Sequence, residues 1–182
     1  FAHHLLEESV QAGDTVVDAT CGNGNDTLVL CQLVGETGQV YAVDIQKQAI
    51  ESTKKRIEEN NFSNVTYVHD SHSNLKHYLP EDLKGKLGGA IFNLGYLPRS
   101  DKKVITKGDS TIAAIETLLE YIRKKALVVI VIYHGHEGGA EEKDAVLHYV
   151  KNLDQKKFAV LKYQFINQQN NPPFIVAIEK LS

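Results

Sequence analysis

The sequence predicts an α/β fold with a doubly wound, mostly parallel sheet, and three features of its hydrophobic pattern predict it. Short apolar runs alternate with longer amphipathic runs from about residue 14 to the end of the chain. Several short runs, such as residues 126–132, are apolar at every position, which is typical of strands covered on both faces. The last two runs have no helical segment between them, so they should pair antiparallel as a hairpin.

The expected elements follow one another in a regular order. An amphipathic helix at residues 2–10 leads the chain. Strands are expected at residues 15–20, 39–45, 65–70, 89–94, 126–133, 158–166 and 174–179. Further helices are expected at residues 27–33, 48–60, 110–125 and 140–153, and in the second of these Ile50, Lys54 and Ile57 share a helical spacing. This alternation requires right-handed crossovers, which place helices on both faces of a seven-stranded sheet.

Composition narrows the class of protein. With 182 residues, 42% hydrophobic and 24% charged, the chain fits one globular domain over residues 1–182. No apolar run reaches the roughly 20 residues that cross a bilayer, and no signal segment opens the chain. Two cysteines are too few for a disulfide framework and indicate a reducing, cytoplasmic compartment. Because the net charge is −3, any contact with nucleic acid must come from a local basic patch.

A glycine-rich loop, with Gly22 and Gly24, joins the first strand to the next helix. Such a loop lets the backbone approach a ligand closely, and dinucleotide sites share it. Charge discriminates between ligands here, because Asp18 and Asp26 bracket the loop and would repel a pyrophosphate at the helix N-terminus. S-adenosylmethionine (SAM) instead carries an ammonium and a sulfonium, which suit a carboxylate-rich pocket. Thr27 also replaces the third glycine of the dinucleotide pattern, so the loop predicts SAM.

Two further strand ends carry acidic residues. Asp44 closes the second strand about 20 residues after the glycines, where an acidic residue takes ribose hydroxyls. Its alternative role is a cap or turn residue. Asp70, Ser71 and His72 end the third strand, where a carboxylate or hydroxyl can accept a hydrogen bond from an adenine amino group. With the terminal antiparallel strand, this pattern is typical of the class I SAM-dependent methyltransferase fold, which is Rossmann-like.

The fourth strand runs into residues 93–98 (NLGYLP), which are a variant of the (D/N)-P-P-(Y/F) motif of amine-directed methyltransferases. In that motif an asparagine accepts a hydrogen bond from the target nitrogen and an aromatic ring packs on the acceptor, which points to Asn93 and Tyr96. Leu94 and Gly95 replace the paired prolines, which leaves open both the ring's position and a plain turn with a core tyrosine. The motif holds no cysteine, so a nitrogen or oxygen acceptor is favoured over a pyrimidine carbon.

Histidines follow the fifth strand at the same edge of the sheet. His134 is a candidate base for an alkylammonium acceptor, and His136 a candidate acceptor contact, although both could belong to a plain loop. No third ligand converges with them, so no metal is expected. Cys21 and Cys31 are expected to be packing residues.

A basic patch of Arg99, Lys102, Lys103 and Lys107 follows the acceptor motif and could contact a phosphate backbone. Two other basic runs, residues 54–56 and 123–125, are expected on solvated helix faces. The chain has no dedicated RNA-binding domain, so selectivity would depend on loops or on a second subunit, and a homodimer stays open.

Four segments together resemble one bacterial family: residues 2–6 (AHHLL), 18–27 (DATCGNGNDT), 93–98 (NLGYLP) and 133–139 (YHGHEGG). The chain is similar over nearly its whole length to the MnmM family of tRNA 5-(aminomethyl)-2-thiouridine methyltransferases, formerly called rRNA methylases. The resemblance implies methyl transfer from SAM to the aminomethyl nitrogen of a modified wobble uridine, and hence binding of the tRNA anticodon arm. It also implies SAM contacts at Asn23, Asn25, Asp44, Gln46, Ser71 and His72.

Other functions are also compatible with the sequence. A small-molecule or ribosomal RNA N-methyltransferase agrees with the acidic net charge and the lack of an RNA-binding module. A SAM-binding RNA regulator without catalysis and a nicotinamide oxidoreductase are more distant alternatives.

Overall fold

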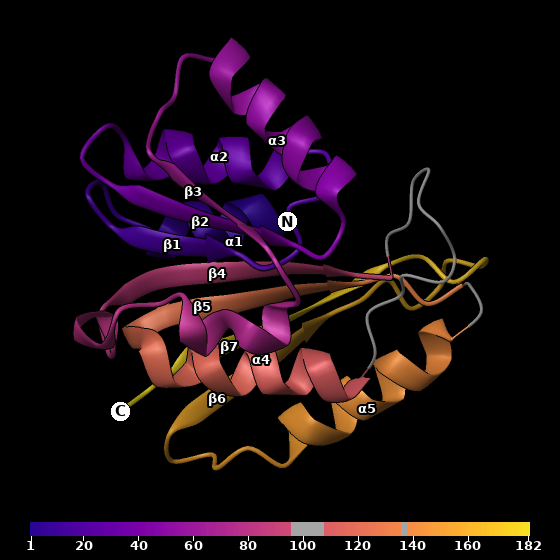
Figure 1. The fold of residues 1–182 in the computed structure, drawn as a ribbon. Coiled ribbons are helices and arrows are strands. Elements are labelled where there is room, and N and C mark those ends of the chain that lie inside the picture. The colour runs from indigo at the N-terminus through magenta and orange to yellow at the C-terminus, as the bar shows by residue number, and fades with distance from the viewer. Residues whose placement is uncertain (96–107, 136–137) are drawn as a thin grey trace.

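The computed structural model describes residues 1–95, 108–135 and 138–182. Within them, seven strands form one mixed sheet in the order β3-β2-β1-β4-β5-β7-β6 (Figure 1). The strands are β1 Thr15–Asp18, β2 Gln39–Asp44, β3 Val65–His69, β4 Leu87–Leu94, β5 Ile122–Ile132, β6 Phe158–Tyr163 and β7 Phe174–Lys180.

Strand pairing confirms the predicted sheet. β1 pairs parallel with β2 and β4, while β2 pairs parallel with β3 and β4 with β5. β7 runs antiparallel to β5 and to β6, so the last two strands form the expected hairpin. Because no helix separates β6 from β7, the chain turns back directly instead of crossing over the sheet.

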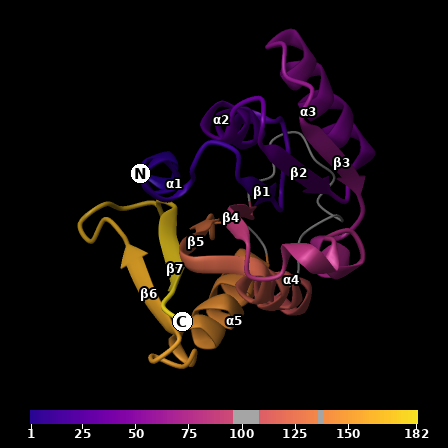
Figure 2. The same ribbon diagram turned by 90° about the vertical axis from the view of Figure 1, so that its left-hand side faces the viewer.

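Helices cover both faces of the sheet (Figures 1 and 2). One face carries α1 Ala2–Ser9, α2 Asn25–Val34 and α3 Lys47–Glu59, and the other carries α4 Gly108–Tyr121 and α5 Gly139–Lys151. Neighbouring strand residues alternate between two hydrophobic clusters, since Val16 and Ile91 pack with α1–α3 whereas Val17 and Phe92 pack on the opposite face. Among the described residues, no helix is both long and apolar enough to traverse a bilayer.

The start of β5 differs from the prediction. The sequence suggests a helix over residues 110–125, but α4 ends at Tyr121 and the strand begins at Ile122. Arg123 is therefore not on a solvated helix face, and its guanidinium donates to the Asp14 carboxylate at 2.8 Å and to the last carbonyl of α1. Three consecutive basic residues after an apolar helix look like a charged helix end, so periodicity could not show the strand.

Smaller corrections concern short or polar elements. The 3-10 helices η1 His72–His77 and η2 Glu81–Leu83 were not predicted, because segments this short have too few turns for periodicity. In α3 the buried residues are Thr53 and Ile57, whereas Lys54 is exposed.

The fold gathers strand ends at one edge of the sheet. The first five strands in the chain are parallel, so their carboxyl ends meet at the same edge, which is where open α/β sheets bind ligands. Because β7 is antiparallel to β5, the connection between β6 and β7 lies at this edge as well (Figure 1).

Candidate cofactor and acceptor site

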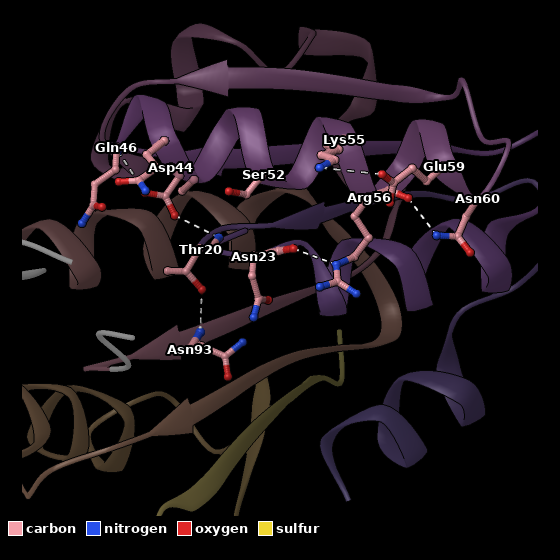
Figure 3. A pocket seen from close by; sticks show the side chains of 13 residues that line it. Thr20, Asn23, Asp44, Gln46, Ser52, Lys55, Arg56, Glu59, Asn60 and Asn93 are labelled. Atoms are coloured by element: carbon pink, nitrogen blue, oxygen red, sulfur yellow. Dashed lines mark hydrogen bonds and ion pairs between the residues drawn. The ribbon is translucent and has the colours of Figure 1, made fainter. Parts of the chain in front are cut away.

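A cavity of about 720 Å³ opens at the carboxyl ends of β1, β2 and β4 and continues along one flank of α3 (Figure 3). The residues that line it are Thr20, Gly22, Asn23, Asp44, Gln46, Gln48, Ala49, Ser52, Lys55, Arg56, Glu59, Asn60 and Asn93. Four of the predicted cofactor residues and the predicted acceptor asparagine therefore lie around one space.

The glycine loop lies directly against α3. Gly22 and Gly24 both have positive φ, at 53° and 88°. A Cβ on Gly24 would lie 2.9 Å from the Cα of Thr53, and the Thr53 hydroxyl donates to the Gly22 carbonyl at 3.0 Å. Gly24 is thus required by backbone conformation and by close packing against α3, although it does not itself line the cavity. Asn25 begins α2, and its N–H donates to the Asn23 side chain at 3.3 Å.

Asp18 lies beneath the loop and is fully buried. Its carboxylate accepts from the Thr27 hydroxyl at 2.7 Å and from the Thr20 N–H at 3.2 Å. Burial raises the pKa of this carboxyl well above its ordinary value, and the negative charges of Asp26 and Asp44 raise it further. These contacts support the loop from below, and Asp18 is not among the described residues that line the cavity.

Asp44 lines the cavity and holds the loop at the same time. One carboxylate oxygen accepts from the Gly22 N–H and the other from the Gln46 N–H, each at 3.0 Å. Burial raises the pKa of the Asp44 carboxyl. Each carboxylate oxygen can accept a second hydrogen bond, so Asp44 serves as a turn residue and keeps acceptor capacity for a ligand. The two roles weighed from the sequence are therefore compatible.

The predicted adenine contacts lie after β3. The Asp70 carboxylate accepts from the Tyr78 hydroxyl at 2.7 Å, the Asn74 amide at 2.9 Å and the Ser71 N–H at 2.7 Å. The first of these bonds is the main cause of its lowered pKa. His72 is buried, and burial lowers its pKa, which favours the neutral imidazole. Since Asp70, Ser71 and His72 are absent from the described cavity lining, their cofactor contacts stay predictions.

Asn93 lies near the end of β4 and borders the cavity. Its backbone N–H donates to the Thr20 hydroxyl at 2.7 Å, and its side-chain amide nitrogen donates to the Asp26 carboxylate. The other Asp26 oxygen lies 2.5 Å from Nε2 of His3 on α1. The acceptor asparagine is therefore held at both its backbone and its side chain. Tyr96, the other acceptor candidate, lies outside the described residues.

His134 follows the strand next to that of Asn93. Leu94 pairs with Ile132, and the imidazole of His134 packs edge-on against Phe174 with ring centroids 5.5 Å apart. Its Nε2 atom is buried and has no hydrogen-bond partner among the described residues. His134 is not among the described residues that line the cavity, so its role as a base stays a prediction. The other predicted acceptor-side residues, His136, Arg99, Lys102, Lys103 and Lys107, lie outside the described residues.

α3 supplies a wall that sequence reasoning did not predict. Seven lining residues belong to α3 or follow it directly: Gln48, Ala49, Ser52, Lys55, Arg56, Glu59 and Asn60. The Arg56 guanidinium donates to the Asn23 carbonyl at 2.8 Å, so the basic run at residues 54–56 is not only a solvated face. These residues recur every three or four positions, but a polar helical stripe usually faces solvent, so the spacing alone did not indicate a site.

Cys21 and Cys31 are buried and free, which confirms their packing role. Burial raises the pKa of both thiols, which keeps them protonated. Within residues 1–95, 108–135 and 138–182, no group of three His, Cys, Asp or Glu side chains is arranged to hold a metal.

Comparison with known proteins identifies the family. Residues 40–179 match the family described as "Putative rRNA methylase". The chain belongs to this family. A chloroplastic tRNA (mnm(5)s(2)U34)-methyltransferase of Arabidopsis thaliana is 36% identical, over 98% of this chain and 68% of that protein.

Solved structures agree with the rRNA methylase family assignment. An rRNA methylase from Streptococcus thermophilus has a TM-score of 0.83 at 40% identity, covering 100% of this chain and 95% of that one. A "putative methyltransferase" from Streptococcus mutans, in complex with SAH, has a TM-score of 0.89 at 42% identity, covering 99% and 96%. The predicted class I methyltransferase fold is thereby confirmed.

Proposed function

We propose that this rRNA methylase family member is a SAM-dependent tRNA methyltransferase. Its acceptor is the aminomethyl nitrogen of 5-aminomethyl-2-thiouridine at the wobble position, and its product is 5-methylaminomethyl-2-thiouridine. The observation that carries the proposal is the position of Asn93, a hydrogen-bond acceptor for an amine, at the border of the cavity that Asp44 and the glycine loop line. Similarity to the Arabidopsis tRNA methyltransferase over nearly the whole chain supports this choice of acceptor.

The cavity residues fit SAM. The volume of about 720 Å³ lies within the roughly 300–1,000 Å³ of typical ligand sites. Asp44 offers acceptor capacity for ribose hydroxyls, and the cavity continues past Gln46 along α3. Asp26 in the first turn of α2 puts a negative charge where a dinucleotide would need to place its pyrophosphate. Lys55 and Arg56 lie farther along α3, and Arg56 already donates to the loop. When bound, SAM supplies a methyl group activated by its sulfonium.

The contribution of the protein is mainly to position the acceptor. The Asn93 side-chain oxygen would accept an N–H from the aminomethyl group and so direct the nitrogen lone pair toward the donor. Such alignment supplies a large part of the lowering of the activation barrier in a group transfer between two molecules. An alkylammonium must lose a proton before it can attack, and His134 is the candidate that would take it. Tyr96 would pack against the flat face of the uracil.

A ribosomal RNA acceptor is the second candidate, because the family description names rRNA and a segment of the chain is 33% identical to a ribosomal RNA small subunit methyltransferase H. Both RNA acceptors would use the basic patch Arg99, Lys102, Lys103 and Lys107 to contact phosphates, and in tRNA we place this contact on the anticodon arm. We place the protein in the cytoplasm, where its two free cysteines stay reduced.

One experiment separates these acceptors. The protein is incubated with SAM and with total tRNA or ribosomal RNA from a strain that lacks the gene, and digested nucleosides are analysed by mass spectrometry. The expected result is one additional methyl on 5-aminomethyl-2-thiouridine, and no change in the ribosomal RNA. An unchanged tRNA profile with protein that binds SAM would contradict the proposal, and a new methyl in ribosomal RNA would favour the second candidate.

A further inference from the structure

Asp26 lies between two segments that are far apart in the sequence. It belongs to the first turn of α2, and its side chain is only 17% exposed. One of its oxygens accepts from the side-chain amide nitrogen of Asn93, 67 residues later in the chain. The other oxygen contacts Nε2 of His3 on α1 at 2.5 Å. Both carboxylate oxygens are thus engaged by side chains from other elements.

These contacts decide which way the Asn93 amide faces. A primary amide has a donating nitrogen and an accepting oxygen of almost the same size, so only its hydrogen-bond partners distinguish the two orientations. A carboxylate can only accept, so Asp26 selects the orientation in which the amide nitrogen points to it. In Figure 3 the amide nitrogen of Asn93 is turned toward the loop that carries Asn23, and the amide oxygen is turned away from that loop.

We propose that Asp26 is a positioning residue for Asn93, which reserves the Asn93 amide oxygen for the N–H of the acceptor amine. In the reverse orientation the amide nitrogen would face the amine, and two donors would oppose each other. The contact with His3 restrains the Asp26 carboxylate, and the bond from the Asn93 N–H to the Thr20 hydroxyl fixes the backbone from which the amide extends. This inference rests on the proposed function, because it assumes an amine acceptor.

Replacing Asp26 with alanine should lower kcat while leaving cofactor binding in place. We expect kcat for tRNA methylation to fall about 10- to 100-fold, the range that results from misplacing a group at a reacting centre. The KM for tRNA and the Kd for SAH should change less than about threefold, because Asp26 is not among the described residues that line the cavity and SAH lacks the sulfonium charge of SAM. Glu141→Ala is the matched control, since Glu141 is an exposed acid in the first turn of α5 and its loss removes the same helix-dipole interaction.

An exchange of the two side chains gives a sharper test. Asn93→Asp alone puts two carboxylates in contact, which repel each other, and it should be nearly inactive. In the double variant Asp26→Asn/Asn93→Asp, one amide again donates to one carboxylate, and the second carboxylate oxygen is free to accept from the amine. We expect the double variant to be at least about tenfold more active than Asn93→Asp. A role of Asp26 in stability alone would also restore the unfolding temperature in the double variant, but it would leave the kcat of folded Asp26→Ala protein unchanged.

The results separate this inference from the proposed function. If the wild-type protein methylates tRNA but the double variant recovers nothing, or Asp26→Ala keeps its kcat within about twofold, the positioning role is wrong. If the wild-type protein methylates no tRNA, the proposed function fails. Thermal unfolding of the same variants without substrate then tests only the hydrogen bond between the side chains at positions 26 and 93. A double variant no more stable than Asn93→Asp would overturn the positioning role of Asp26.

Discussion

At the scale of single residues, the aspartates around the glycine loop differ in environment and therefore in role. Asp18 is fully buried under the loop, Asp44 lines the cavity and binds two backbone N–H groups, and Asp26 connects α2 to Asn93. Asp70 is surrounded by donors from η1 and from the residue that follows η1. The sequence predicts an acidic site here, but only the contacts show which carboxylate meets the cavity.

The raised pKa of Asp18 predicts a pH-dependent stability. Because burial raises its pKa in the folded state above the ordinary 3.8, the folded protein binds more protons than the unfolded chain above that pH. The free energy of unfolding should therefore fall as pH rises from about 4 through the raised pKa. Asp18→Asn should remove this dependence and stabilise the protein at pH 8 by about 1 kcal/mol or more, as measured by urea denaturation at several pH values.

Asp70→Asn is the control, because the contribution of Asp70 to the free energy of unfolding changes with pH in the opposite direction. The pKa of Asp70 is lowered, so its stabilisation is present above the ordinary pKa of 3.8 and is lost as pH falls below it. An Asp18→Asn variant whose stability falls with pH as steeply as the wild type would contradict the assignment of Asp18 as the buried, proton-binding carboxyl.

Asp44→Ala should weaken SAH binding by about 10- to 100-fold, because it removes a ligand contact and releases the Gly22 and Gln46 N–H groups together. Isothermal titration calorimetry measures this change. Glu36→Ala, which removes an exposed acid after α2, should leave the Kd unchanged. Equal affinities for the Asp44→Ala variant and the wild type would remove Asp44 from the cofactor site.

At the scale of elements, the β1-loop-α2 unit and α3 form the site by packing against each other. Thr53 on α3 touches the place where a Gly24 side chain would be, and α3 continues as one wall of the cavity. The loop could be predicted, because glycines directly after a predicted strand indicate a tight turn from the neighbouring sequence alone. The α3 wall could not be predicted, because it depends on how α3 lies over the loop, and no local pattern in residues 47–59 encodes that contact.

Gly24→Ala should destabilise the protein more than Gly138→Ala. Both glycines adopt the left-handed conformation, with φ/ψ of 88°/6° and 80°/−12°, so both substitutions bear the cost of a left-handed alanine, about 1 kcal/mol or more. Only the Gly24 Cβ would collide with backbone, 2.9 Å from the Thr53 Cα, whereas nothing lies within 4 Å of a Cβ at Gly138. Chemical denaturation should show an additional loss of about 1–2 kcal/mol at Gly24, and equal losses would show that α3 gives way easily.

At the scale of the whole molecule, the parallel sheet accounts for most of what the sequence could predict. The mostly parallel sheet and its terminal hairpin follow from apolar runs and from the missing last crossover, so the fold class and the active edge were both accessible. The boundary between α4 and β5 could not be predicted. The basic residues Arg123, Lys124 and Lys125 resemble a charged helix end, although they belong to β5. The contact of Asp26 with Asn93 was also inaccessible, because it joins two elements that meet only after folding.

The basic patch predicted from the sequence should contribute to the binding of tRNA. The double substitution Lys102→Glu/Lys103→Glu should raise the KM for tRNA about tenfold or more and reduce the salt dependence of binding, because it removes phosphate contacts. Lys156→Glu/Lys157→Glu is the matched control, since these exposed lysines precede β6 at the opposite edge of the sheet. Methylation kinetics measure the KM, filter binding at several salt concentrations measures the salt dependence, and equal KM values for the two variants would place the RNA elsewhere.

Every role assigned above assumes that the cavity beside Asp44 and the glycine loop receives a methyl donor and not a phosphate-bearing nucleotide. Titration calorimetry with SAH and with NAD⁺ on the wild-type protein tests this most directly. We predict stoichiometric binding of SAH that Asp44→Ala weakens, and no heat from NAD⁺. Tight binding of NAD⁺ with no measurable affinity for SAH would contradict the account.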